Sequence, residues 1–377
     1  MKILVLNAGS SSLKSCLYDI TGDRLSPIAS PPLWQGTVDW THQQGVAELT
    51  VKTVSGVRWS KALHDASRQT VTAHLLETLW SGETQVIASQ AAIDIVGHRV
   101  VHGGRDYQTS TRITPVVKEA IARLAKFAPI HNPVNLEGIE ACEALLGDVP
   151  QVAVFDTAFH AHLPLAAKVY PGPYEWIEQG IQRYGFHGIS HQYCAERAAQ
   201  LLGRSLDELR LIVCHLGNGC SLSAIRNGHS VDTTMGFTPL EGLMMGTRSG
   251  SVDPGILIHL LRQEGYTADQ LDQLLNRQSG IKGLSGVSED VRTLLEAIAS
   301  GNSRAQLALD VFIHRLRSCI GAMLPSLGGL DALVFTAGIG ENSALVRAAA
   351  CEGFGFLGIA VDPDKNDAHP IDSDIAT

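Results

Sequence analysis

Two stretches of this 377-residue chain repeat one arrangement, in which an apolar strand, a turn of small residues and a second strand follow one another. The first runs from Ile3 to Asp19 and precedes Thr21-Gly22, and the second runs from Leu211 to Arg226 and precedes Asn227-Gly228. Asn-Gly after a strand is a strong indication of a hairpin turn. Small turn residues let the backbone approach a ligand, and consecutive N–H groups form an anion-binding hollow. The repeat therefore predicts two such hollows, which together suit a polyphosphate.

Chain length and charge narrow the class of protein. A chain of 377 residues exceeds what one hydrophobic core usually serves, so we expect two domains, residues 1–150 and 151–377, with a turn-like boundary ending at Pro150. The 29 basic and 38 acidic residues give a formal net charge of −9, which disfavours nucleic acid and anionic membranes as partners.

Cysteine usage and hydropathy indicate the compartment. The seven cysteines are scattered and lack CxxC spacing, which fits a reducing environment. No apolar run approaches membrane-spanning length, and the apolar residues after Met1 are too few for a secretory signal. We therefore expect a cytoplasmic protein without a membrane partner.

Apolar runs alternate with segments of helical periodicity. Ala92–Val101, Val152–Phe155 and Ala332–Phe335 predict buried strands, whereas Thr70–Trp80 and Val116–Phe127 predict helices. Such alternation is typical of an α/β fold.

Two common nucleotide motifs do not account for the glycines. Residues 353–358 match GxGxxG, but a dinucleotide site needs a strand before the motif and a helix after it, and the order here is reversed. GxxxxGK[ST] does not occur in the sequence, which excludes a Walker-type loop. A bound nucleotide would need another architecture.

The first repeat places Asn7, Ser10, Ser12 and Lys14 beside one turn. Strand alternation puts the last three on one face, where lysine suits phosphate and hydroxyl or amide oxygens suit Mg²⁺. A polar hairpin facing solvent would explain the same residues. The second repeat, His215 to Gly219, offers backbone donors without a lysine, and the pairing of the two favours phosphate.

A third glycine-rich turn, TAGIGEN from Thr336 to Asn342, separates an apolar strand from a helix. Its N–H groups at a helix N-terminus suit a phosphate or a nucleoside. A tight structural turn capped by Asn342 or Ser343 explains it equally well.

Charged residues among small and aliphatic neighbours are the next candidates. Arg99 in HRVVHGG and Arg248 in MMGTRSG are each either a structural ion pair or an anion clamp. Asp156 ends an apolar strand in VFDTAFH, which suits a catalytic or metal-linked carboxylate or a helix N-cap.

Histidines in RYGFHGISH allow a zinc pair, because His187 and His191 are four residues apart. Gly185 and Gly188 argue against a regular helix there, so we expect one capping and one functional histidine. HNPVN, residues 131–135, fits a proline-containing loop with a capping asparagine.

Together these motifs resemble the acetate kinase family. LNAGSSSLK, HRVVHGG, HNP, VFDTAFH, RYGFHGISH, HLGNG, MGFTPLEGLMMGTRSG and FTAGIGEN occur in that family's order across essentially the whole chain. The resemblance implies a duplicated two-domain, actin-like ATPase fold of the ribonuclease H-like kind, with nucleotide in the interdomain cleft. It implies reversible in-line phosphoryl transfer from ATP to acetate, giving acetyl phosphate and ADP. It also implies Mg²⁺, or Mn²⁺ in its place, and a homodimer.

The resemblance assigns roles residue by residue. The catalytic positions are Asp156, Arg99, Arg248 and His187. The acetate-binding positions are Arg99 and a methyl pocket of Val101, Ile130, Phe186 and Pro239, and the metal-site position is Asn7. The ATP-binding positions are Ser10, Ser12, Lys14, His215, Leu216, Gly217, Asn218, Gly219, Asp290, Val291, Arg292, Gly338, Ile339, Gly340, Glu341 and Asn342.

Charge neutralisation is the expected source of catalysis. Two unit charges about 4 Å apart repel by about 4 kcal/mol at an effective dielectric constant near 20. We expect Arg99, Arg248, His187 and Mg²⁺ to offset this repulsion. Because the carboxylate nucleophile is already ionised, Asp156 is expected to orient the metal or an arginine rather than to move protons.

Two alternatives stay open. A propionate kinase of the same family differs by one methylene in an apolar pocket, worth about 1–3 kcal/mol. A non-kinase, actin-like nucleotide switch would not need Arg99 and Arg248 as an acyl-anion clamp. Family members also continue with a strand and a helix that carries an acidic Mg²⁺-site residue, which the sequence ending at Thr377 is expected to lack.

Overall fold

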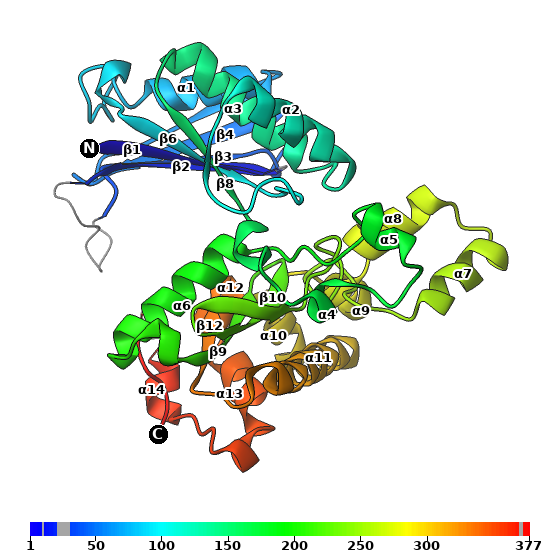
Figure 1. Ribbon diagram of the computed structural model, residues 1–377. Coiled ribbons are helices and arrows are strands. Elements are labelled where there is room, and N and C mark those ends of the chain that lie inside the picture. The colour runs from blue at the N-terminus through cyan, green and yellow to red at the C-terminus, as the bar shows by residue number, and fades with distance from the viewer. Residues whose placement is uncertain (10, 21–30, 369–371) are drawn as a thin grey trace. The chain divides into compact units, whose positions relative to one another are not determined.

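The structure, a computed structural model, describes residues 1–9, 11–20, 31–368 and 372–377. It divides into two compact units, Met1–Ala158 and Phe159–Thr377, coloured blue to green and green to red in Figure 1. The boundary falls later than residue 150, because β8 (Gln151–Phe155) pairs with β6 (Ile95–Val100) in the sheet of the first unit. The apolar run that we expected to open the second domain is therefore a central strand of the first.

An eight-stranded sheet forms the centre of the first unit, in the order β5-β4-β3-β2-β1-β6-β8-β7. Neighbouring strands from β1 to β5 are antiparallel, whereas β6 runs parallel to β1 and β8 parallel to β6. The remaining strands are β1 (Lys2–Ala8), β2 (Ser12–Asp19), β3 (Trp34–Asp39), β4 (Val46–Thr53), β5 (Arg58–His64) and β7 (Thr111–Arg112).

Helices cover one face of this sheet (Figure 1). They are α1 (Arg68–Glu77), α2 (Pro115–Arg123) and α3 (Asn132–Leu146), with the short turns η1 (Gln90–Ala92) and η2 (Leu124–Lys126). Leu4 and Leu6 of β1 are buried in one core with Leu75 of α1. Because side chains alternate along a strand, the opposite face of β1, β2 and β6 carries Asn7, Lys14 and Arg99.

The second unit repeats the central part of the first. Its four-stranded sheet has the order β11-β10-β9-β12, from strands β9 (Arg210–Leu216), β10 (Cys220–Arg226), β11 (His229–Thr233) and β12 (Ala332–Thr336). Three consecutive strands are antiparallel and the fourth runs parallel to the first of them, as in β3-β2-β1-β6. The doubled strand-turn-strand pattern of the sequence is therefore a structural duplication.

Two helices cover opposite faces of the second sheet. Residues of α6 (Gly188–Leu202) pack with Leu211 and Val213, whereas Cys319 of α11 (Ser303–Leu327) lies near Cys214, which points to the other face. The other helices are α4 (Leu165–Lys168), α5 (Glu175–Glu178), α7 (Pro254–Arg262), α8 (Ala268–Arg277), α9 (Gly280–Ser285), α10 (Val291–Ala299), α12 (Ala337–Asn342), α13 (Ala344–Glu352) and α14 (Pro363–Asp367). Short 3₁₀ turns are η3 (Ala158–His160), η4 (Leu206–Glu208) and η5 (Gly355–Leu357).

Most local predictions are confirmed, and three are wrong. Asn227 and Gly228 adopt left-handed φ angles of 53° and 77° in the turn between β10 and β11, as predicted, whereas Thr21-Gly22 lies outside the described residues. TAGIGEN is not a turn before a helix, because Ala337–Asn342 form the helix α12. HNPVN is not a loop, because α3 begins at Asn132. Gly188 does not prevent a helix either, since it is the first residue of α6, where its missing side chain costs little.

Two absences concern compartment. Among the described residues, no helix combines the length and hydropathy that crossing a bilayer requires. All seven cysteines, each of which is described, are free thiols.

Candidate active site

Asn7, Arg99 and Asp156 form one hydrogen-bonded cluster on the first unit. Arg99 donates from Nη1 to Oδ1 of Asn7 and from Nε to Oδ2 of Asp156, both over 3.0 Å, and its Nη2 contacts the same carboxylate oxygen. Asp156 is buried, while the Arg99 side chain is 31% exposed. The carboxylate raises the pKa of Arg99. Arg99 is therefore an ion-paired arginine that still presents part of its guanidinium at the surface.

The β1–β2 hairpin brings Lys14 beside this cluster. Lys14 lies opposite Asn7 in the register of the two strands, and the turn is closed by the Gly9 N–H, which donates to the Ser12 carbonyl over 2.8 Å. Ser12 and Lys14 are on the same face of β2, as predicted, and Ser10 lies outside the described residues. The exposed ammonium of Lys14 is available to a phosphate.

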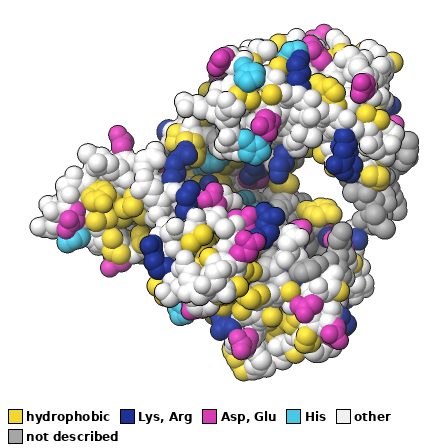
Figure 2. Space-filling model, turned by 180° about the vertical axis from the view of Figure 1, so that it is seen from behind, with side chains coloured by type: hydrophobic (Ala, Val, Ile, Leu, Met, Phe, Trp, Pro, Cys, Tyr) yellow, Lys and Arg dark blue, Asp and Glu magenta, His cyan; other side chains and the backbone are white. Residues whose placement is uncertain are grey.

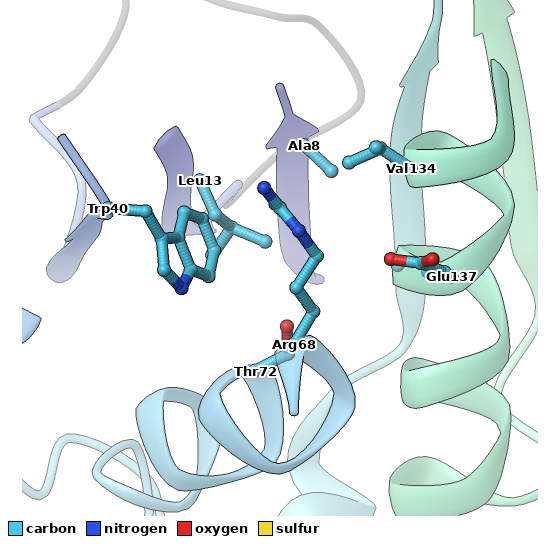
Figure 3. Close-up of a pocket in the computed structure, with 8 residues that line it drawn as sticks. Ala8, Leu13, Trp40, Arg68, Thr72, Val134 and Glu137 are labelled. Atoms are coloured by element: carbon cyan, nitrogen blue, oxygen red, sulfur yellow. The ribbon is translucent and has the colours of Figure 1, made fainter. Parts of the chain in front are cut away.

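Arg68 and Trp40 hold this turn from the helical side of the sheet, a feature that motif analysis missed. Arg68 rises from α1, with its guanidinium carbon 4.2 Å from the centre of the Trp40 ring (Figure 3). Its Nη1 donates to the Gly9 carbonyl over 3.2 Å, and the backbone N–H of Trp40 donates to the Ser11 carbonyl over 3.1 Å. The turn is thus anchored at two of its carbonyl groups.

Asn132 and Asn135 at the start of α3 fix the ends of β1 and β6. Asn135 donates to the Ala8 carbonyl over 2.7 Å and accepts from the Val101 N–H over 3.0 Å. Asn132 accepts from the His102 N–H over 3.1 Å. Both side chains are buried, so these two residues of HNPVN position the neighbouring strands. Their spacing of three residues places them on one face of a helix, which could have indicated this role from the sequence.

His187, Gly219 and Arg248 converge on the second unit. A Cβ on Gly219 would lie 3.4 Å from Nε2 of His187 and 3.5 Å from Nη1 of Arg248. His187 precedes α6 with φ of 57°, a left-handed conformation that is uncommon for a residue other than glycine. The missing side chain of Gly219 therefore leaves space beside one imidazole nitrogen and one guanidinium nitrogen.

Arg248 differs from Arg99 in its partners. Its Nη1 donates to the Pro239 carbonyl over 3.4 Å, and no carboxylate within the described parts of the chain lies at ion-pair distance from it. Burial lowers the pKa of Arg248. A largely desolvated guanidinium without a carboxylate is poorly stabilised until an anion binds.

The β9–β10 turn carries the histidine and glycine positions predicted for ATP. The His215 and His187 rings stack with centroids 4.1 Å apart, and Nδ1 of His215 lies 2.8 Å from the Ser190 hydroxyl. The Gly217 N–H donates to the Gly219 carbonyl over 3.1 Å. Leu216, which precedes them, is buried in the sheet.

Both remaining ATP segments border this turn. Thr336 pairs with His215 in the sheet, and a Cβ on Gly217 would lie 3.6 Å from the Cβ of Ala337, the first residue of α12. Gly246 donates to the Asn218 carbonyl over 3.0 Å, and a Cβ on Gly246 would lie 3.1 Å from Cβ of Glu289. The structure thus brings together Gly338–Asn342, His215–Gly219 and the segment that leads to Asp290–Arg292.

Helix capping accounts for part of these segments. Asp290 is the N-cap of α10, accepts from the Arg292 N–H over 2.8 Å and pairs with the Arg292 guanidinium. Ser343 caps α13, as one of the two structural alternatives predicted. Their functional assignment stays a prediction.

The four residues predicted to surround a methyl group are divided between the units. Val101 is buried and Ile130 is 45% exposed in the first unit. Phe186 is buried in the second unit, directly before His187, and Pro239 contacts Arg248 through its carbonyl. Phe186 is thus adjacent in sequence to His187, and Pro239 lies in contact with Arg248.

Within the described residues, no group of three or more histidine, cysteine, aspartate or glutamate side chains is arranged to hold an ion. His187 through Nδ1 and His191 through Nε2 both contact the Ser221 hydroxyl, over 2.9 and 2.7 Å. The oxygen donors of Asn7 and Asp156 suit a hard cation such as Mg²⁺, which nucleotide phosphates and water hold in large part.

A duplicated α/β fold that presents glycine-rich turns, a lysine and two arginines defines an ATPase of the two-domain, actin-like class. The sequence matches the acetokinase family over residues 2–376, and the chain belongs to that family.

Acetate kinases of other organisms align with this chain over its full length. It is 67% identical to the acetate kinase of Cyanothece sp. (strain PCC 7425 / ATCC 29141), in an alignment that covers 100% of this chain and 92% of that protein. It is 66% identical to the acetate kinase of Gloeobacter violaceus, covering 100% and 93%. The structure is similar to that of Porphyromonas gingivalis acetate kinase, with a TM-score of 0.88, 41% identity and coverage of 97% and 90%. A propionate kinase from Francisella tularensis also has a TM-score of 0.88, with 38% identity and coverage of 97% and 91%.

Proposed function

We propose that this chain is an acetate kinase, which transfers the γ-phosphoryl group of ATP directly to acetate and forms acetyl phosphate and ADP. The observation that carries the proposal is Arg248, a desolvated guanidinium that has no carboxylate partner among the described residues and lies with His187 beside the space over Gly219. A pure nucleotide switch has no use for such an anion clamp. Family membership and full-length relatives that are acetate kinases support the same activity.

The two clusters have complementary roles in this proposal. On the first unit, Lys14 is the proposed ligand of the nucleotide phosphates, and Arg99 offsets charge on the substrates. On the second unit, the turn at His215–Gly219 and the short helix α12, which holds Gly338–Asn342, bind the nucleotide, and Arg248 offsets repulsion between acetate and the phosphoryl group. His187 donates to the phosphoryl oxygens as charge develops there. Asp156 orients Arg99, because both Nε and Nη2 of Arg99 bind one of its oxygens.

Magnesium is the proposed cofactor, with Mn²⁺ as a substitute. Asn7 and Asp156 each have a side-chain oxygen that accepts a hydrogen bond from Arg99. Mg²⁺ is commonly held by one or two side-chain oxygen ligands together with phosphates. When bound, the ion neutralises charge on the phosphates. The Asn7 amide oxygen already accepts from Arg99, so the chain's own residues fit an ion held mainly by the nucleotide.

Propionate is the second candidate acceptor, because the structure is similar to that of a propionate kinase. Val101, Ile130, Phe186 and Pro239 are the proposed contacts of the acyl group, and one methylene changes binding there by about 1–3 kcal/mol. The test is kcat/KM for acetate, propionate and butyrate at fixed MgATP. The proposal requires acetate to have the highest value, and a preference for propionate would assign the chain to the other activity.

A homodimer is proposed from an apolar surface on α7. Ile256, Ile258 and Leu261 are 49%, 47% and 41% exposed, and no residue of the helix is buried. Figure 2 shows hydrophobic side chains grouped on the projection at the left, where the turned view places α7. Light scattering should give twice the chain mass, and Ile258→Glu should give a monomer.

Free cysteines support the proposed cytoplasmic location.

A further inference from the structure

Ser221 links two histidines of the second unit. Its hydroxyl lies 2.9 Å from Nδ1 of His187 and 2.7 Å from Nε2 of His191. Ser221 is on β10 and His191 on α6, and both are fully buried. His187 therefore uses Nδ1 for this contact, while its Nε2 lies beside the space over Gly219.

Proton counting leaves three arrangements. A serine hydroxyl has one hydrogen and two lone pairs, so it either donates to one histidine and accepts from the other, or accepts from both. In the first, His191 donates from Nε2 to Ser221, and Ser221 donates to Nδ1 of His187, whose own proton is then on Nε2. In the second, His187 donates from Nδ1, and His191 must carry its proton on Nδ1. In the third, Ser221 accepts from both, and its own buried hydrogen would have no acceptor, because the two imidazoles are its only side-chain contacts within the described residues.

His191 favours the first arrangement. Burial lowers the pKa of His191 well below its usual value, so the ring carries one proton. Its Nδ1 is buried and has no hydrogen-bond partner within the described residues. The second arrangement would place an N–H there with no acceptor, and such buried donors are rarer in proteins than buried acceptors without a donor. A doubly protonated His187 would require either that proton on His191 or a buried Ser221 hydrogen without an acceptor.

His160 fixes the backbone at the same place. Its Nε2 lies 3.1 Å from the Phe186 carbonyl, which can only accept, so Nε2 carries the proton. Its Nδ1 then accepts from the Ser230 hydroxyl at 2.8 Å. The residue before His187 is thus held while His187 keeps its left-handed conformation.

We propose that Ser221 and His191 are positioning residues that hold the proton of His187 on Nε2, so that a neutral imidazole directs an N–H donor into the space beside Gly219 and Arg248. That a phosphoryl group occupies this space rests on the proposed function, whereas the position of the proton does not. His187 then donates a hydrogen bond to its ligand without first gaining a proton.

The test is ¹⁵N spectroscopy of histidine-labelled full-length protein, in which imidazole nitrogen shifts report which nitrogen is protonated. The His187 signals are assigned by their loss in His187→Gln. Unmodified protein at neutral pH should show a protonated Nε2 and an unprotonated Nδ1 for His187. A protonated Nδ1 of His187 in the unmodified protein would overturn the proposal.

Variants test the relay itself. Ser221→Ala should redistribute the His187 proton between both nitrogens, whereas Ser221→Thr, which keeps the hydroxyl, should preserve the Nε2 form. The matched control is Ser223→Ala, since Ser223 is equally buried on β10 but contacts Thr233. An unchanged His187 spectrum in folded Ser221→Ala would overturn the proposal.

Kinetics adds a readout that depends on the proposed function. Removing one transition-state donor costs about 10²–10³ in kcat, so Ser221→Ala should lower kcat roughly tenfold or more with KM for ATP within about twofold. Ser223→Ala should leave kcat unchanged. A protein that lacks acetate-dependent activity but holds the Nε2 proton would refute the proposed function and support the relay.

Discussion

Arg99 and Asp156 form an ion pair in which two guanidinium nitrogens of the arginine bind the same carboxylate oxygen. The geometry fixes the plane of the guanidinium and leaves Nη1 to Asn7. Arg248, on the other unit, has no such carboxylate within the described residues. One arginine is thus oriented in advance by the fold, while the other depends on its ligand for a counter-charge.

Asp156→Asn tests the orienting role. The amide keeps the shape of the carboxylate but removes its charge, so Arg99 loses its fixed orientation, and we expect kcat to fall about 10²-fold. The dependence of rate on Mg²⁺ concentration should also change. Both are measured in steady-state assays across a Mg²⁺ titration, and an unchanged metal profile would count against a charge-dependent metal role.

The matched control is Asp331→Asn, which breaks a comparable pair away from the site. Asp331 binds Arg204 over 3.1 Å and Arg210 over 2.9 Å, and these contacts hold its pKa well below its usual range. Because the pair lies at the surface, we expect a stability loss of at most about 1 kcal/mol in urea unfolding and an unchanged kcat. Equal losses of kcat in both variants would show that the effect is not specific to Asp156.

Gly219→Ala should fill the space beside His187 and Arg248. The added Cβ would stand 3.4 Å from Nε2 of His187, where the phosphoryl group is proposed to bind. Misplacement of a reacting group by about 1 Å can cost roughly 10²-fold, so we expect kcat/KM to fall between about 10- and 100-fold. Gly321→Ala, in α11 with open space around its Cβ, should stabilise the protein by about 0.5–1 kcal/mol and leave the rate constants unchanged.

Arg68→Lys should loosen the β1–β2 turn. Lysine keeps the charge but loses the planar stack on Trp40 and the hydrogen bond to Gly9, contacts worth about 1–2 kcal/mol together. We expect KM for ATP to rise about tenfold and KM for acetate to change little. Arg58→Lys on the exposed part of β5 is the control, and an equal change there would contradict the anchoring role.

Acid should destabilise the first unit through two buried histidines. Burial lowers the pKa of His98 and of His102 from 6.5 to about 4. Between these values the unfolded chain binds protons that the folded chain does not, so the free energy of unfolding falls as pH falls, by about 2 kcal/mol per histidine at pH 5. Urea unfolding at pH 7 and pH 5 measures the difference.

His98→Gln should remove its part of this pH dependence, because the amide does not titrate. His42→Gln is the control of opposite sign: Glu48 raises the pKa of His42, so His42 stabilises the fold at low pH and loses that contribution as pH rises. A His98→Gln protein with the slope of unmodified protein would contradict the prediction.

Local patterns predicted the duplicated core well. The repeated strand-turn-strand segments form β1–β2 and β9–β10, and Asn227-Gly228 forms the turn from β10 to β11, because apolar runs and small-residue turns are local properties of the chain. The runs at Ala92–Val101 and Ala332–Phe335 became the parallel strands β6 and β12. Whole-chain motif order identified the family, which the sequence comparisons confirm.

Side-chain pairing between distant segments could not be predicted in the same way. Arg68 binds Gly9 and Asn135 binds Ala8, contacts separated by 59 and 127 positions, for which no periodicity exists. From the sequence, Arg99 was either a structural ion pair or an anion clamp. The ion pair with Asp156 follows only from the parallel pairing of β6 with β8, which brings the two residues together. The domain boundary was placed too early because a strand's sheet membership depends on tertiary pairing.

The most direct test is formation of an acyl phosphate by the purified chain. With MgATP and acetate, hydroxylamine should trap acetyl hydroxamate, and the product should require acetate. Arg248→Ala should abolish the product while nucleotide binding persists, because the proposed clamp acts on the transferring group. Tight ATP binding with no trapped acyl group in the unmodified protein would contradict the account.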